Sequence, residues 1–184
     1  MGTVFEVKKQ IPDNCSMKET VEQYIARITG LVGSADPLGI IETTPARIAE
    51  VLNELDAAAT RYKPSPEKWS IREQVAHLAD TEMVMSTRMH WAAAQPGKGI
   101  VAFDQDLWAT TGKYASTPVE LSLPTFTAMR RWTVDFLRRL TPTEQEGQIM
   151  HEERGKESLP RLMVMMAGHD INHLQQIAEL VKAK

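Results

Sequence analysis

The chain has 184 residues, of which 42% are hydrophobic and 24% charged, and its formal net charge is −3 at pH 7. This length and composition are typical of one soluble globular domain, and the lack of a basic stripe argues against nucleic acid as a partner. No apolar run is long enough to span a membrane, and the N-terminus lacks the apolar block of a signal peptide. The single cysteine, Cys15, excludes an internal disulfide. We therefore expect a cytoplasmic protein without a membrane partner.

Apolar residues recur at helical spacing along most of the chain, whereas no run of alternating β-branched residues indicates a sheet. After an N-terminal tail, residues 1–16, we expect a single helical domain over residues 17–184. The predicted helices, in chain order, are 17–32, 43–62, 70–94, 122–140 and 158–182. Together they predict an all-α four-helix bundle with an additional N-terminal helix.

Local signals indicate where two of these helices begin. Thr44 and Pro45 in "TTPARIAEVL" predict a cap followed by a proline at the first helical position. Ser70 and Glu73 form a Ser-x-x-Glu capping box at the start of the third helix, which "QPGKG" ends. This third helix carries apolar residues on two sides, so we expect it to lie centrally in the bundle.

A long connection, residues 95–121, separates the third and fourth predicted helices and contains "FDQDLWATTGKY". Connections of this length are usually functional lids or disordered segments, and the aromatic residues favour an ordered lid. Asp104, Asp106 and Trp108 are therefore candidates to contact a substrate. In the alternative interpretation the acids are solvated and the tryptophan only covers the underside of the loop.

The stretch "GHDINHLQQI" places His169 and His173 four residues apart on the apolar side of the last helix. At about 100° per residue the two rings lie about 40° apart and one turn along, so their nitrogens are able to converge on one ion. Alternatively, both are core histidines bonded to a carbonyl or a carboxylate. Zinc hydrolases with His-Glu-x-x-His have a glutamate base where this chain has Asp170.

Gly168, in the middle of the same helix, either lets another helix approach closely or is only a position of lower helix stability.

The other histidines differ in their positions. His77, in "WSIREQVAHLADTE", is in mid-helix on a line that points into the protein. His90 lies about 220° further round the same helix and cannot join it at one ion. His151, in "MHEERGKESLP", is expected in a loop and solvated.

The segments "WSIREQVAHLADTE" and "HEERGKESLPRLMVMMAGHDINHLQQI" together resemble the DinB-like superfamily, in particular its YfiT-like branch of metal-dependent hydrolases and bacillithiol-type thiol S-transferases. The resemblance extends over about residues 20–182 and includes "EQYIARITGL", "TTPARIAEVL" and "FTAMRRWTVDFL". It implies a DinB-type four-helix bundle, a frequent homodimer, and a divalent metal held by three histidines, here His77, His169 and His173. Where relatives commonly have proline after the loop histidine, this chain has Glu152, which leaves the role of His151 open.

Three neutral imidazoles leave a coordination position for water or substrate and select poorly among zinc, nickel, iron and manganese. The resemblance implies a thiol-dependent transferase or a hydrolase that acts on a small electrophilic substrate, with a low-molecular-weight thiol as cosubstrate in the first case. Further candidates are His151 for catalysis and Arg130 or Arg131 for an anionic substrate or thiol. For the substrate pocket, Gln176 is a candidate in addition to Trp108.

Two other classes of function remain open at this point. The chain is alternatively a non-catalytic, metal-stabilised bundle that acts as a binding or stress-response protein. That hypothesis predicts a fourth protein ligand, such as His151 or a carboxylate, and no accessible pocket. In the third interpretation there is no metal and the histidines are bonded internally.

Overall fold

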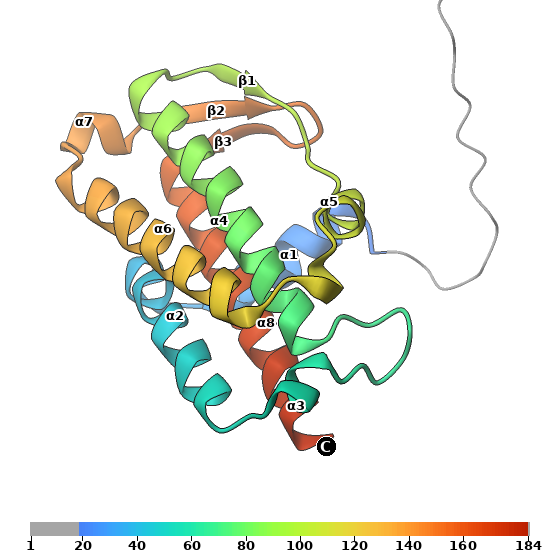
Figure 1. Ribbon diagram of the computed structural model, residues 1–184. Coiled ribbons are helices and arrows are strands. Elements are labelled where there is room, and N and C mark those ends of the chain that lie inside the picture. The colour runs from blue at the N-terminus through green and yellow to red at the C-terminus, as the bar shows by residue number, and fades with distance from the viewer. Residues whose placement is uncertain (1–18, 184) are drawn as a thin grey trace, which may run out of the picture.

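The computed structural model describes residues 19–183, which form a helical bundle with a small sheet at one end (Figure 1). The predicted tail 1–16 and Cys15 lie outside the described residues. The longer helices are α1 (Val21–Val32), α2 (Pro37–Asn53), α4 (Ile71–Ala94), α6 (Val119–Arg139) and α8 (Leu159–Lys182). Short helices are α3 (Ala57–Arg61), α5 (Gln105–Thr111), α7 (Pro142–Gln145) and the 3-10 turn η1 (Tyr114–Ser116). No helix in the described part of the chain could cross a membrane.

The bundle consists of α2, α4, α6 and α8, with an additional N-terminal helix, as the sequence predicts. That helix, α1, packs on α8. Helix α4 contacts α6 and α8, and α2 contacts the same two helices from the other side. The predicted capping box is present, since Ser70 accepts from the Glu73 backbone and the Glu73 carboxylate accepts from the Ser70 backbone. Helix α8 begins after Ser158, whose side chain accepts from the backbone N–H of Arg161.

Helix α2 begins seven to eight residues before the predicted cap, and that prediction was wrong. Asp36 accepts from the backbone N–H groups of Leu38 and Gly39, and Pro37 takes the first helical position. Pro45 consequently lies inside the helix, where it lacks the N–H that would bond the Ile41 carbonyl. The guanidinium of Arg130 donates to that carbonyl instead, at 2.6 Å.

A three-stranded sheet was not predicted. It contains β1 (Lys98–Ile100), β2 (Gln148–His151) and β3 (Gly155–Ser158), with β1 parallel and β3 antiparallel to β2. Strands of three and four residues are too short to show an alternating pattern. The expected loop 95–121 is accordingly structured by β1, α5 and η1.

The core of the described chain has two apolar clusters with a layer of buried polar side chains between them. Each bundle helix passes from one cluster to the other through this layer. In α4, for example, Leu78 belongs to one cluster and Met85 to the other, while Glu82 between them is fully buried. The polar residues of the layer are Thr44 on α2, His77 and Glu82 on α4, Arg130 and Thr133 on α6, and Asp170 and His173 on α8.

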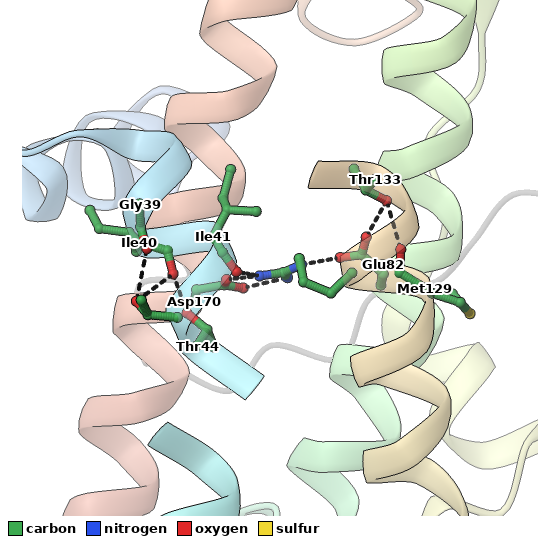
Figure 2. Close-up of polar contacts among 10 residues, drawn as sticks. Gly39, Ile40, Ile41, Thr44, Glu82, Met129, Thr133 and Asp170 are labelled. Carbon is green, nitrogen blue, oxygen red and sulfur yellow. Dashed lines mark hydrogen bonds and ion pairs between the residues drawn. The ribbon is translucent and has the colours of Figure 1, made fainter. Parts of the chain in front are cut away.

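Arg130 of α6 is the cation of this layer, and the other three bundle helices supply its partners Ile41, Glu82 and Asp170 (Figure 2). Its Nε donates to Glu82 at 2.6 Å, and its two terminal nitrogens donate to Asp170. Thr133 donates to the second Glu82 oxygen at 2.5 Å. Burial opposes the charged form of Arg130, but Asp170 and Glu82 outweigh it and raise the pKa of the guanidinium.

Gly168 allows α1 to pack closely against α8. A Cβ atom at this position would lie 2.0 Å from the backbone oxygen of Ile28, which is inside van der Waals contact. The first of the two sequence interpretations of Gly168, close approach of another helix, is therefore confirmed. The approach lies one residue from His169, so it also sets the position of α1 beside the histidines.

We expect Gly168→Ala to destabilise the protein by about 1–3 kcal/mol, because backbone atoms of α1 must move although alanine is the better helix former. Gly30→Ala is the matched control, since a Cβ there meets nothing within 4 Å. It should be neutral or stabilising by up to about 1 kcal/mol. Urea denaturation of both variants measures the difference, and equal stabilities would contradict the close approach.

Arg130→Met should cost about 3–5 kcal/mol of unfolding free energy, because it leaves Glu82 and Asp170 buried without a cation. Arg138→Met, on the same helix as Arg130, removes an exposed ion pair with Glu42 of α2 and should cost less than about 1 kcal/mol. Denaturant titrations compare the two substitutions. A loss for Arg130→Met as small as that for Arg138→Met would show that the buried cluster contributes little.

Candidate metal centre

Three histidine side chains from two helices converge at one edge of the polar layer. The Nε2 atom of His169 lies 3.0 Å from that of His77 and 3.1 Å from that of His173. One ligand nitrogen from each ring lies within 4.8 Å of the others. Helix α8 places His169 and His173 one turn apart, and the packing of α4 on α8 brings His77 to them.

Gln74 orients one of these rings. Its Oε1 lies 3.1 Å from Nδ1 of His173, so that nitrogen donates its proton to the amide and Nε2 keeps a free lone pair. This arrangement is the usual way in which a second residue positions a metal-binding histidine. Gln74 lies one turn before His77 on α4, and sequence reasoning did not select it.

Burial keeps the three rings neutral. It lowers the pKa of His77 to about 4, and burial together with the field of His77 lowers that of His173 to about 3. The pKa of His169 also falls well below its ordinary value, through burial and then through the neighbouring His173 and His77. Neutral imidazoles are the form that binds metal ions.

Aromatic residues cover one side of the histidines. The ring of Trp69 lies 4.8 Å from that of His77, and Tyr114 meets Trp69 edge-on at 6.2 Å. The Tyr114 hydroxyl donates to Asp80 at 2.5 Å, so Asp80 holds this wall and is not a fourth ligand. Within residues 19–183 no further histidine, cysteine or carboxylate joins the three rings.

A cavity of about 100 Å³ opens beside the histidines. Helices α1, α4 and α8, the segment before α5 and the turn between β2 and β3 enclose it. Its lining residues are Tyr24, His77, Thr81, Met85, Arg88, Phe103, Gln105, Arg154, Met165, Met166 and His169. The site is therefore accessible on one side and closed by protein on the other.

Several predicted site residues lie away from this cavity. Arg130 is engaged by Glu82 and Asp170, and Arg131 is exposed on the outer side of α6. Both line a different groove, between α2 and α6. Two other arginines, Arg88 and Arg154, line the cavity beside the histidines.

The predicted lid residues support the cavity from outside it. Asp104 caps α5 by accepting from the backbone of Asp106 and Leu107, and Asp106 is exposed. Trp108 packs edge-on against Phe103, with ring centroids 5.2 Å apart, and Phe103 lines the cavity.

Two further candidates occupy other places. Gln176 is exposed and lines a separate groove with Trp69 and Gln74. His151 is not a solvated loop residue, as we had expected, but a buried residue of β2. Its Nδ1 accepts from the Glu153 backbone, and its Nε2 is buried without a hydrogen-bond partner in the described part of the chain. The short strand that buries it left no pattern in the sequence.

The residues present suit a divalent metal ion. Nitrogens bound to one tetrahedral zinc ion at 2.0–2.1 Å lie about 3.3 Å apart, close to the two shorter separations here. Moreover, His77 and His173 both direct Nε2 at the same nitrogen of His169, which has at most one proton to share between them. An ion satisfies all three lone pairs at once.

A comparison with protein-family models agrees with this geometry. The model described as "DinB superfamily" matches residues 40–177. The chain belongs to the DinB superfamily. The matched range includes all three histidines and the four bundle helices with the exception of the first residues of α2 and the last of α8.

Relatives in this superfamily bear names that refer to a metal. A protein of Oceanobacillus iheyensis named "Putative metal-dependent hydrolase" is 32% identical over 164 residues, which cover 88% of this chain and 93% of that protein. Another of the same name, from Geobacillus kaustophilus, is 29% identical over 166 residues, which cover 89% of this chain and 85% of that protein.

A solved structure confirms the fold. The structure of YfiT from Bacillus subtilis, described as "a probable metal-dependent hydrolase with an unusual four-helix bundle topology", superposes with a TM-score of 0.73 at 18% sequence identity. The match covers 93% of each chain. The predicted DinB-type four-helix bundle is therefore confirmed.

The lowered histidine pKa values predict acid sensitivity of the metal-free protein. Below about pH 6.5 the histidines of the unfolded chain bind protons, whereas the buried rings of the folded chain stay neutral. The unfolding free energy therefore has its full value above that pH and falls as the pH drops toward 4. In this pH range the unfolding free energy should fall by about 1.4 kcal/mol per pH unit for each buried histidine. Urea titrations between pH 7.5 and 5 in the presence of a chelator measure it, with those pH limits chosen to bracket the ordinary histidine pKa.

Two variants control this measurement. His173→Gln should reduce the pH slope of the unfolding free energy by one histidine's share. His90→Gln, outside the cluster, should reduce that slope less. If His173→Gln kept the full slope of the parent, His173 would not be held neutral by the fold.

Proposed function

We propose that the chain is a metal-dependent enzyme in which His77, His169 and His173 hold a divalent ion that activates a nucleophile toward a small electrophilic substrate. The observation that carries this proposal is the convergence of three Nε2 atoms without a fourth protein ligand among residues 19–183, beside a cavity that two of the rings line. Catalytic metal sites commonly have three protein ligands and an open position, whereas structural sites have four. The names of the relatives point the same way.

The residues of the chain divide the work around the ion. A divalent ion held by imidazoles supplies Lewis acidity toward a water, a thiol or a carbonyl oxygen. Gln74 keeps His173 in the tautomer that binds, and Trp69 with Tyr114 excludes water from one side. The Thr81 hydroxyl lies 3.3 Å from Nε2 of His77 and lines the cavity, where it can orient the incoming group.

Thiol transfer is the reaction that these residues favour over hydrolysis. No carboxylate is among the residues that line the cavity, and Asp170, which follows His169, is held by Arg130 inside the bundle. The glutamate base of the His-Glu-x-x-His hydrolases thus has no counterpart at this position. A thiol, with an ordinary pKa of about 8.5, ionises far more readily than water and needs no base.

Hydrolysis is the second candidate, favoured by the names of the relatives. Assembly as a homodimer and a cytoplasmic location stay predictions from the sequence. The non-catalytic bundle requires a closed shell of four ligands, and the described part of the chain provides three.

Protein purified without a histidine tag should contain about one divalent ion per chain, as expected for a three-histidine site. His173→Ala should lose the ion, while His90→Ala should retain it, because His90 stacks on Phe136 outside the cluster. Elemental analysis of the three proteins decides the point. A parent that stays metal-free after incubation with zinc or nickel would overturn the proposed function.

The loaded parent is then assayed with cysteine and chlorodinitrobenzene for thiol transfer, and with a nitrophenyl ester for hydrolysis. Activity with the first pair alone supports the transferase, and activity with the ester alone supports the hydrolase. Inactivity of the metal-loaded protein in both assays, with a broader panel of thiols and esters, would favour the binding protein.

A further inference from the structure

Arg88 is a buried cation that has no carboxylate partner among residues 19–183. It lies on α4 with 5% of its surface exposed, and it makes no ion pair with the residues that the structure describes. One terminal nitrogen donates to the Val101 carbonyl at 3.0 Å, and the other lies 4.0 Å from the Met85 sulfur, a weak acceptor. The guanidinium lies 5.9 Å from the ring centroid of Phe103. Burial is the main cause that lowers its pKa to about 10, so it is still charged at neutral pH.

The surroundings of Arg88 have an excess of positive charge. Arg154, from the turn between β2 and β3, lines the same cavity and donates two hydrogen bonds to Glu157, at 2.8 and 3.0 Å. Arg161 approaches the same carboxylate at 4.0 Å. The fully buried Glu157 carboxylate therefore contacts two arginines, and it acts on the third, Arg88, only through its field. Glu152, in the same turn, is exposed and accepts from the Ala102 backbone.

The cavity extends from Arg88 and Arg154 at one end to the histidines at the other. His77 and Arg88 lie eleven positions apart on α4, a rise of about 16 Å along the helix axis, and the arginine side chain reaches back over part of that distance. Between them the wall is mainly apolar, with Met85, Met165 and Met166. A ligand that contacts both ends must therefore have an anionic group separated by several bonds from the group that meets the metal.

We propose that Arg88, assisted by Arg154, binds the carboxylate of an extended substrate or cosubstrate whose reacting atom lies at the three-histidine site. This inference rests on the proposed function and adds the class of ligand, an anionic molecule with an apolar middle. A guanidinium whose described partners are one carbonyl and one sulfur suits a carboxylate, because a carboxylate can accept two parallel charge-assisted hydrogen bonds from it. The methionines suit the middle because they adapt to different shapes.

The test compares two thiols of equal length on cobalt-loaded protein, mercaptohexanoate and mercaptohexanol. Both thiols give a thiolate-to-cobalt absorption band on binding, so affinity is read without any enzymatic turnover. The parent should bind the carboxylate roughly ten- to a hundredfold more tightly, as expected for hydrogen bonds to charged groups. Mercaptopropionate, which is too short to reach both ends, should show little preference over mercaptopropanol.

Arg88→Met should abolish the preference for mercaptohexanoate while leaving the affinity for mercaptohexanol and the cobalt content unchanged. Arg88→Lys keeps the positive charge but lacks the two parallel donors of the guanidinium, so it should retain only part of the preference. This variant replaces Arg88→Met in the test if the methionine variant does not fold. Arg138→Met, an exposed arginine outside the cavity, should behave as the parent.

The outcomes separate this inference from the function on which it rests. A parent that binds cobalt and both hexyl thiols equally would overturn the anion site and leave the metal-dependent function standing. A preference that survives in Arg88→Met would overturn the assignment of Arg88. A parent that binds no cobalt, or cobalt but neither thiol, would overturn the open metal site and the inference with it.

Discussion

The buried ion cluster around Arg130 is the constraint on which the rest of the structure depends. Glu82 from α4, Asp170 from α8 and the Ile41 carbonyl from α2 all accept from this one side chain of α6 (Figure 2). A charge removed from water is tolerated only when its partners are correctly placed. The cluster therefore fixes the register and the rotation of the four helices. A slip of one residue in any of them would leave a buried group unpaired.

The metal centre uses that register. Asp170 follows His169 directly, so the ion pair that holds Asp170 toward α6 also determines how α8 presents His169 and His173 toward α4. Gly168 lets α1 approach the same turn, and Tyr24 of α1 forms part of the cavity wall. The structural cluster and the histidine cluster are thus neighbouring parts of one polar layer, one closed and satisfied, the other open to a cavity.

The small sheet has a role that its size does not suggest. By pairing the connection after α4 with the hairpin before α8, it brings Arg154 to the cavity and supports the segment that contains Phe103. Three short strands contribute little core, but they hold together two chain segments that are about 50 residues apart, as in the bond from Ala102 to Glu152. The far end of the cavity exists because of this pairing.

The sequence by itself determined the features that depend on neighbouring residues. The capping box at Ser70, the extents of α4 and α8 to within a residue, and the convergence of His169 and His173 follow from hydrogen bonds and spacing within one helix. The resemblance supplied His77. The sheet, the start of α2 at Pro37, and the position of Arg88 rather than Arg130 at the cavity were decided only by tertiary structure.

The physical reason is the same in each of these cases. A proline inside a helix is tolerable when a distant donor takes its place, and an arginine is free for a ligand only when no buried carboxylate claims it. Arg130 meets its carboxylates across 48 and 40 residues of chain, on helices whose facing sides no local pattern specifies. Which of several similar arginines is paired and which is left open was therefore decided by the packing of the helices.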